Sequence, residues 1–174
     1  MRDLRSAPAP PLHAGDHVRG PADAPLVIIY GEFTCPQCAL AHVRLRDVPV
    51  LLVFRHFALR SKPRAVALAQ AAEAAAAQGR FWELHDALFA DQGRQDDPHL
   101  WAHAERLGLD VKRFERDRRG PAAAARVTSD TRTGMRAGVA STPALLLGER
   151  LVHGPPDVEL LAEISAAASE AERE

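Results

Sequence analysis

The chain has only two cysteines, and both lie in the short segment that joins a predicted strand to a predicted helix. Residues 26–30 form a continuous apolar run rich in β-branched side chains, which is typical of a strand buried on both faces. Residues 36–46 follow with a helical pattern that begins at Pro36. At such a junction we expect Cys35 to sit at the start of the helix, with Cys38 within reach as a disulfide partner.

The rest of the chain alternates strands and helices, which predicts an α/β fold. The predicted elements after the first helix are a strand at residues 50–57, helices within residues 61–119, a helix at about 122–136, strands at 144–147 and 150–153, and a helix at 157–168. The first two strands should be parallel, because a helix separates them and a right-handed crossover joins such pairs. Gly148 favours a hairpin turn between the last two strands. The order is therefore βαβ, a block of helices, then ββα.

A chain of 174 residues is expected to form one domain with a core that needs no disulfide staples. We expect a flexible, proline-rich segment at residues 1–14 and a single domain at residues 15–168. The helical block at about residues 61–119 is an insertion in that domain, and residues 169–174 form an acidic tail.

Three motifs, in this order, carry a resemblance to a known family: residues 31–38 (GEFTCPQC), residues 54–59 (FRHFAL) and residues 139–143 (VASTP). Over about residues 14–168 the chain resembles the DsbA-like branch of the thioredoxin-fold thiol–disulfide oxidoreductases, which carry their helical insertion between the second and third motifs. The resemblance implies a thioredoxin fold with a helical insertion, and exchange of disulfides with protein substrates.

The spacing of the cysteines predicts different roles for the two thiols. With Pro36 at the first helical position, Cys35 is the N-cap, and its sulfur faces unpaired backbone N–H groups and the positive end of the helix dipole. Both effects lower the pKa of a thiol, so Cys35 is the expected nucleophile and the deeper Cys38 the resolving thiol. The alternative is zinc. Two cysteines with two of His42, His56 and His85 would complete a tetrahedral site.

The resemblance adds a substrate-binding role for Thr142, Pro143, Pro36 and Gln37. Pro143 occupies the position of the family's cis-proline beside the cysteine pair, which leaves the backbone of Thr142 free to pair with an extended substrate. In strongly oxidising DsbA the second residue between the cysteines is histidine. Gln37 carries no positive charge, so we expect a less depressed thiol pKa here and a reduction potential below the DsbA value of about −120 mV.

Other titratable side chains give weaker signals. Glu32, three residues before Cys35, is a candidate for proton transfer to and from Cys38, the alternative being an ordinary hydrogen-bonded carboxylate. His56, on a buried strand, is expected to be a hydrogen-bonded structural residue, and His42 is expected on the solvent side of the first helix. Many family members have a His-Pro pair where Lys62 and Pro63 stand here, so the role of that histidine is not carried over.

The predicted function is therefore thiol–disulfide exchange through Cys35 and Cys38, without a bound cofactor or metal. The alternative is a redox-sensing or zinc-binding module that regulates a partner. The expected partners are protein thiols and disulfides and a redox recycling partner. A net charge of −1 argues against nucleic acid, and no apolar run is long enough to cross a membrane. The lack of a secretory signal and of structural disulfides favours the cytoplasm, the alternative being an extracytoplasmic protein whose signal peptide has been removed. No dimerisation segment is evident, which favours a monomer.

Overall fold

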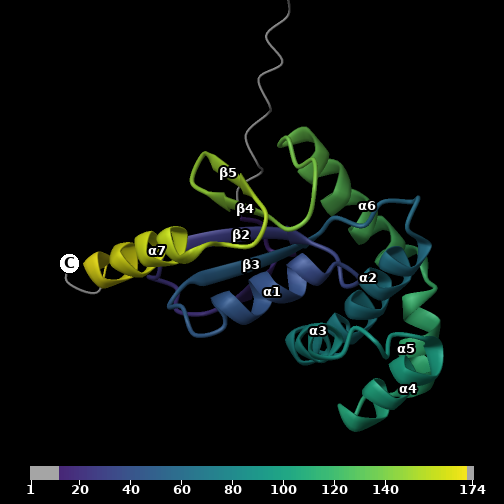
Figure 1. Ribbon diagram of the computed structural model, residues 1–174. Helices are drawn as coiled ribbons and strands as arrows, with labels where there is room; N and C mark the ends of the chain where they lie inside the picture. The colour runs from purple at the N-terminus through teal and green to yellow at the C-terminus, as the bar shows by residue number, and fades with distance from the viewer. Residues whose placement is uncertain (1–11, 172–174) are drawn as a thin grey trace, which may run out of the picture.

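The computed structural model describes residues 12–171, and in it a five-stranded sheet lies between helices (Figure 1). The strands, in spatial order, are β1 (His17–Arg19), β3 (Leu51–His56), β2 (Leu26–Gly31), β4 (Ala144–Leu147) and β5 (Arg150–His153). The pair β2 and β3 is parallel, and the other pairs are antiparallel. The predicted thioredoxin fold with mixed α/β architecture is confirmed.

Seven helices lie within the described residues: α1 (Pro36–Leu45), α2 (Pro63–Ala76), α3 (Phe81–Ala90), α4 (Asp97–Arg106), α5 (Val111–Arg118), α6 (Pro121–Arg136) and α7 (Val158–Ala171). Helix α1 makes the crossover between the parallel strands. Helices α2 to α5 follow β3 and gather at one end of the molecule, where α2 contacts α3, α5 and α6 (Figure 1). Among residues 12–171 no helix is both long and apolar enough to span a bilayer.

The central strand β2 is buried on both faces, as its continuous apolar run predicts. Val27 and Ile29 face the larger core, which also holds side chains of α1, α2 and α3. Ile28 and Tyr30 face a second, smaller core on the other side of the sheet. Helix α6 packs closely there, because a Cβ atom on Gly134 would lie 2.9 Å from the ring of Tyr30.

Strand β1 is an element that the sequence pattern did not predict. It is three residues long and pairs antiparallel with the outer edge of β3. A buried ion pair holds it in place. Arg55 on β3 donates from Nε to Asp16 Oδ1 at 3.0 Å and from a terminal nitrogen to Oδ2 at 2.8 Å. The carboxylate of Asp16 is fully buried, and the hydrogen bond from Arg55 helps to hold its pKa below the ordinary value against the effect of burial.

The two ends of the chain differ in detail from the expected boundaries. The expected flexible segment falls largely on residues 1–11, which lie outside the described residues, whereas His13 and Asp16 already form a hydrogen-bonded turn. Helix α7 continues to Ala171, three residues beyond its expected end, because the alanine-rich stretch at residues 166–168 has a high helix propensity. The rest of the expected acidic tail, residues 172–174, lies outside the described range.

Candidate active site

The cysteine pair lies at the N-terminus of α1, directly beyond the end of β2. Cys35 is the N-cap residue and Pro36 occupies the first turn. The carbonyl oxygen of Cys35 accepts hydrogen bonds from the backbone amides of Cys38 at 3.1 Å and Ala39 at 3.2 Å, at the start of the helix. Cys35 is partly exposed, whereas Cys38, one turn deeper, is 1% exposed. Both thiols are free, and only the first is accessible from solution.

The surroundings push the pKa values of the two thiols in opposite directions. The hydrogen bond from Cys38, together with Thr142 and the backbone amides of Cys38 and Gln37, lowers the pKa of Cys35 to about 5 although partial burial opposes this. The same sulfur–sulfur contact, together with burial, raises the pKa of Cys38 far above its ordinary value. At neutral pH the exposed sulfur is therefore a thiolate and the buried sulfur a thiol.

The loop between α6 and β4 brings Thr142 and Pro143 to this pair. The Sγ atom of Cys35, when protonated, donates to the carbonyl oxygen of Thr142 at 3.4 Å. The peptide bond between Thr142 and Pro143 is cis, and Pro143 is buried at the start of β4. Pro36 and Gln37 are both exposed on the first turn of α1. The side chains expected to bind substrate therefore surround one accessible sulfur.

Glu32 lies beneath the cysteine pair and is 2% exposed. Its Oε2 accepts hydrogen bonds from the backbone amide of Thr34 at 2.7 Å and from the Thr34 hydroxyl at 2.5 Å. Its Oε1 accepts from Lys62 Nζ at 3.1 Å. This bond raises the pKa of Lys62, and the nearby Cys35 and Cys38 thiols add to the effect. Lys62 thus places a cation bound to Glu32 near the thiol pair, a link that the sequence reasoning missed.

Two glutamines after α3 hold the loop that carries the cysteines. The side-chain amide of Gln92 donates to the backbone carbonyls of Phe33 and Cys35, both at 2.9 Å. The amide of Gln95, which is 7% exposed, donates to the carbonyls of Phe33 at 2.8 Å and Leu88 at 3.1 Å. No sequence signal identified these residues, because their role depends on where the helical block is placed against the loop.

Four of the histidines lie in two side-chain clusters that contain no cysteine. Among the described residues, two groups bring together three side chains of metal-ligand type: His17 with His56 and Glu73, and His42 with His85 and Asp86. Neither group includes a cysteine, so the geometry gives no support to a Cys2His2 zinc site. His56 is fully buried and its Nε2 lies 2.7 Å from Glu73 Oε1, in agreement with a structural role.

The expected position of His42 on the solvent side of α1 is wrong. Its side chain is 8% exposed, because α3 covers that face of α1. The ring of His42 stacks on Phe89, with ring centroids 5.5 Å apart, and burial lowers its pKa below the ordinary value. It is therefore a neutral, buried side chain at neutral pH.

Comparison with known proteins places the chain among proteins of this architecture. A protein-family model described as Thioredoxin matches residues 13–164. Three solved structures cover 93–94% of the chain. The first is a thioredoxin-like oxidoreductase from Silicibacter pomeroyi DSS-3, with a TM-score of 0.78, 23% identity and 95% of that chain covered. The second is alpha-DsbA1 from Wolbachia pipientis, with a TM-score of 0.77, 19% identity and 95% of that chain covered. The third is oxidised BdbD from Bacillus subtilis, with a TM-score of 0.76, 19% identity and 98% of that chain covered.

The curated relatives are more similar in sequence than these solved structures, and they are named as Na(+)/H(+) antiporters. The Na(+)/H(+) antiporter NhaA 3 of Salinispora tropica is 42% identical over 166 residues, which cover 88% of this chain and 25% of the antiporter. The Na(+)/H(+) antiporter NhaA of Herminiimonas arsenicoxydans is 35% identical over 173 residues, which cover 95% of this chain and 28% of that protein. The chain thus spans about a quarter of the length of the curated relatives it matches.

Proposed function

Because the chain belongs to the DsbA-like thioredoxin-fold family, we propose that it is a thiol–disulfide oxidoreductase that exchanges disulfides with protein substrates through Cys35 and Cys38. The observation that carries the proposal is the asymmetry of the two thiols. Cys35 is accessible with a pKa lowered to about 5, and its hydrogen-bonded neighbour Cys38 is buried with a raised pKa. A stable thiolate beside a protonated resolving thiol is what disulfide exchange requires.

The proposed reaction balances without a bound cofactor. The Cys35 thiolate attacks one sulfur of a substrate disulfide, forming a mixed disulfide and releasing the other substrate sulfur as a thiolate, which takes up a proton. Cys38 then loses its proton and attacks the Cys35 sulfur, which releases the substrate's second thiol. The substrate gains two electrons, and the protein is left with a Cys35–Cys38 disulfide. The reverse sequence oxidises a substrate dithiol.

The surrounding residues fit this sequence of steps. The carbonyl of Thr142 faces the reactive sulfur, and Pro143, Pro36 and Gln37 complete the surface that an extended substrate would meet. The buried carboxylate of Glu32 pairs with the exposed ammonium of Lys62 near the thiols, and we assign Glu32 as the group that exchanges a proton with Cys38. We further propose that the protein acts as a monomer and is returned to its starting redox state by a separate partner.

The test is dithiothreitol-dependent reduction of insulin. The protein should accelerate it, Cys35→Ser should abolish the acceleration, and Cys38→Ser should trap a mixed disulfide that mass spectrometry detects. Glu32→Gln should slow the resolving step and change its pH dependence while leaving alkylation of Cys35 intact. Insulin reduction that survives Cys35→Ser would overturn the proposal. Stoichiometric zinc bound through the cysteines would also overturn it.

A second candidate is a redox-sensing module that regulates a partner. The similarity of 88% of this chain to a quarter of a Na(+)/H(+) antiporter favours such a pairing, with an antiporter of this kind as the partner. The test is Na+/H+ exchange in proteoliposomes that hold the Salinispora tropica antiporter lacking its matching region, with this chain added oxidised or reduced. Regulation predicts different exchange rates for the two forms. The Cys35→Ser/Cys38→Ser protein, which cannot form the disulfide, is the control. Equal rates would remove this candidate.

A further inference from the structure

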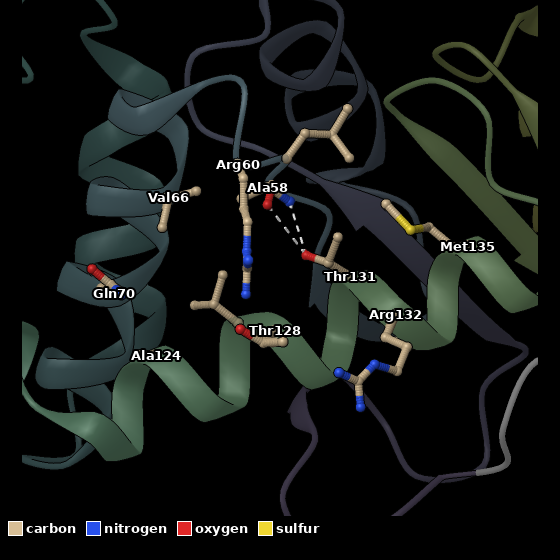
Figure 2. Close-up of a pocket in the computed structure, with 11 residues that line it drawn as sticks. Ala58, Arg60, Val66, Gln70, Ala124, Thr128, Thr131, Arg132 and Met135 are labelled. Carbon is tan, nitrogen blue, oxygen red and sulfur yellow. Dashed lines mark hydrogen bonds between the residues drawn. The ribbon is translucent and has the colours of Figure 1, made fainter.

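A groove of about 530 Å³ lies between α2 and α6, next to the loop that follows β3 (Figure 2). Its lining includes none of the residues assigned above to disulfide exchange. The floor is apolar and is formed by Ala58, Val66 and Val127, and Met135 extends it along α6 with 54% of its surface exposed. Exposed methionine beside small apolar side chains is typical of surfaces that adapt to varied peptide side chains.

The charged groups of this groove are both cationic. Arg60 extends from the loop into the groove toward Thr128 on α6, and Arg132 lines it from α6 (Figure 2). Neither arginine forms an ion pair with any residue in the range 12–171, although most arginines of that range do. No aspartate or glutamate is among the described residues that line the groove. Two guanidinium groups without an ion-pair partner among residues 12–171, above an apolar floor, are complementary to a ligand that carries carboxylates beside apolar side chains.

The groove is preformed rather than created by a ligand. The hydroxyl of Thr131 accepts a hydrogen bond from the backbone amide of Ala58 at 3.2 Å and lies 3.5 Å from the carbonyl of the same residue (Figure 2). These contacts fix the loop against α6 at the base of the groove. Binding there would therefore not have to order the walls first.

Both walls of the groove continue into the cysteine site. The loop that carries Arg60 leads within two residues to Lys62, whose ammonium binds Glu32 beneath the thiols. Helix α6, which carries Arg132, leads after its last residue into the loop that ends at Thr142, beside the Sγ atom of Cys35. Residues 60–62 and 132–142 thus link the groove to the reactive sulfur, and an extended polypeptide bound at both places would run beside these segments.

We propose that this groove binds an acidic, partly apolar segment of the polypeptide substrate, and so makes disulfide exchange selective for such substrates. This proposal rests on the proposed function and names its substrate class. The net charge of the chain is −1, so a preference for acidic peptides does not follow from overall attraction. It requires the local pair of arginines.

The test uses two peptides of about twelve residues, long enough to span roughly 40 Å when extended. Each peptide has one terminal cysteine held as a disulfide to 2-thiopyridine. One alternates glutamate with leucine and the other alternates lysine with leucine. Cys35 of the reduced protein attacks the disulfide and pyridine-2-thione leaves; each protein molecule reacts once, so the initial rate gives a second-order rate constant. The measured quantity is the ratio of this rate constant for the acidic peptide to that for the basic peptide, and 2,2′-dithiodipyridine serves as a small reference substrate.

We expect the wild-type ratio to be about tenfold or more, since each exposed ion pair adds up to about fivefold. The Arg60→Glu/Arg132→Glu protein should bring the ratio to one or below, whereas the Arg60→Lys/Arg132→Lys protein should keep most of it. Arg46→Glu is the matched control for the single reversals Arg60→Glu and Arg132→Glu, each of which should lower the ratio, because Arg46 is also exposed and lies at the far end of α1. An equal effect of Arg46→Glu, or a wild-type ratio near one, would overturn the proposal.

Binding measured without chemistry separates this proposal from the proposed function. Fluorescence anisotropy with a cysteine-free acidic peptide should show binding that weakens with salt and with Arg60→Glu/Arg132→Glu. Such binding in a protein that exchanges no disulfide would refute the proposed function and leave the groove assignment standing. Active exchange with no groove-dependent binding would refute the groove assignment alone. Binding of anionic lipid vesicles that needs both arginines, without binding of the peptide, would also overturn it.

Discussion

Replacing Cys38 with alanine tests the origin of the reactivity of Cys35. The hydrogen bond from Cys38 is the largest single influence on the pKa of Cys35, which it lowers to about 5. A hydrogen bond to a charged group contributes about 1.5–3 kcal/mol, which corresponds to roughly one to two pKa units. Cys38→Ala should therefore raise the pKa of Cys35 to about 6–7. Cys38→Ser keeps a hydroxyl donor and should raise it less.

The assay is the rate of Cys35 alkylation by iodoacetamide as a function of pH, read by mass spectrometry. In the wild-type protein about 99% of Cys35 is thiolate at pH 7, so the rate should be flat from pH 6 upward and fall about tenfold per pH unit below pH 5. In the alanine variant the midpoint should move upward. A wild-type midpoint near that of free cysteine, about 8.5, would refute the reasoning, as would identical midpoints for wild type and Cys38→Ala.

The same asymmetry fixes how the reduction potential depends on pH. A lowered thiol pKa stabilises the reduced protein at pH values above about 5, and this stabilisation is lost as the pH falls through that value. Above pH 5, reduction of the disulfide takes up two electrons and one proton, since Cys38 stays protonated. The potential should therefore fall by about 30 mV per pH unit there and by about 60 mV per unit below pH 5. Equilibration with glutathione buffers at several pH values measures both slopes.

Three further predictions concern stability, and urea unfolding measures each of them. Burial lowers the pKa of His85 to about 4, so as the pH falls the unfolded chain takes up a proton at this histidine before the folded protein does. The free energy of unfolding should therefore fall by about 3 kcal/mol between pH 6.5 and pH 4. His85→Phe should make this decline shallower, and an unchanged slope would contradict the lowered pKa of His85. Gln95→Ala leaves the carbonyl of Phe33 with one donor fewer and should lower the free energy of unfolding by about 1–2 kcal/mol, whereas an unchanged urea midpoint would show that this hydrogen bond does not stabilise the fold. Asp16→Asn breaks a buried ion pair with Arg55 and should lower the free energy of unfolding by about 3 kcal/mol. A decrease below about 1 kcal/mol would argue against the ion pair.

Local patterns were sufficient to predict the part of the site that consecutive residues build. The apolar run of β2, the proline at the start of α1 and the cysteine before it are neighbours in sequence, and each has a strong local preference. The placement of Cys35 at the N-cap and of Cys38 one turn deeper follows from helix geometry alone. The fold class followed from the order of these elements, because parallel strands require a crossover helix.

Contacts between distant segments were not predictable in the same way. Arg55 and Asp16 are 39 residues apart, and Gln92 lies 57 residues from Cys35. A short edge strand such as β1 has no distinctive pattern in three residues, and its pairing depends on a buried arginine in another strand. Glutamine side chains that bind backbone carbonyls also have no sequence signature, because any carbonyl is an acceptor.

The burial of His42, in contrast, could have been predicted from its spacing along the helix. Residues four apart share one face of a helix, and His42 stands four residues after Cys38, which the N-terminal geometry already placed on the inner side. A histidine on that face is buried unless the neighbouring surface is open to solvent. Helical position thus predicts a buried His42, and α3 covers the face in question.

The chemistry of the cysteine pair depends on both kinds of contact. The helix start and the neighbouring thiol are local, but the carbonyl of Thr142 that meets Cys35 comes from 107 residues further along the chain. The pKa of Cys35, which the hydrogen bond from Cys38 lowers to about 5, lies between the values of about 3.5 for DsbA and about 7 for thioredoxin. A thiolate of intermediate stability favours an intermediate reduction potential, because the reduced form is stabilised less than in DsbA. Under the proposed function such a pair is suited to either direction of exchange, and we expect the redox poise of its surroundings to decide which direction predominates.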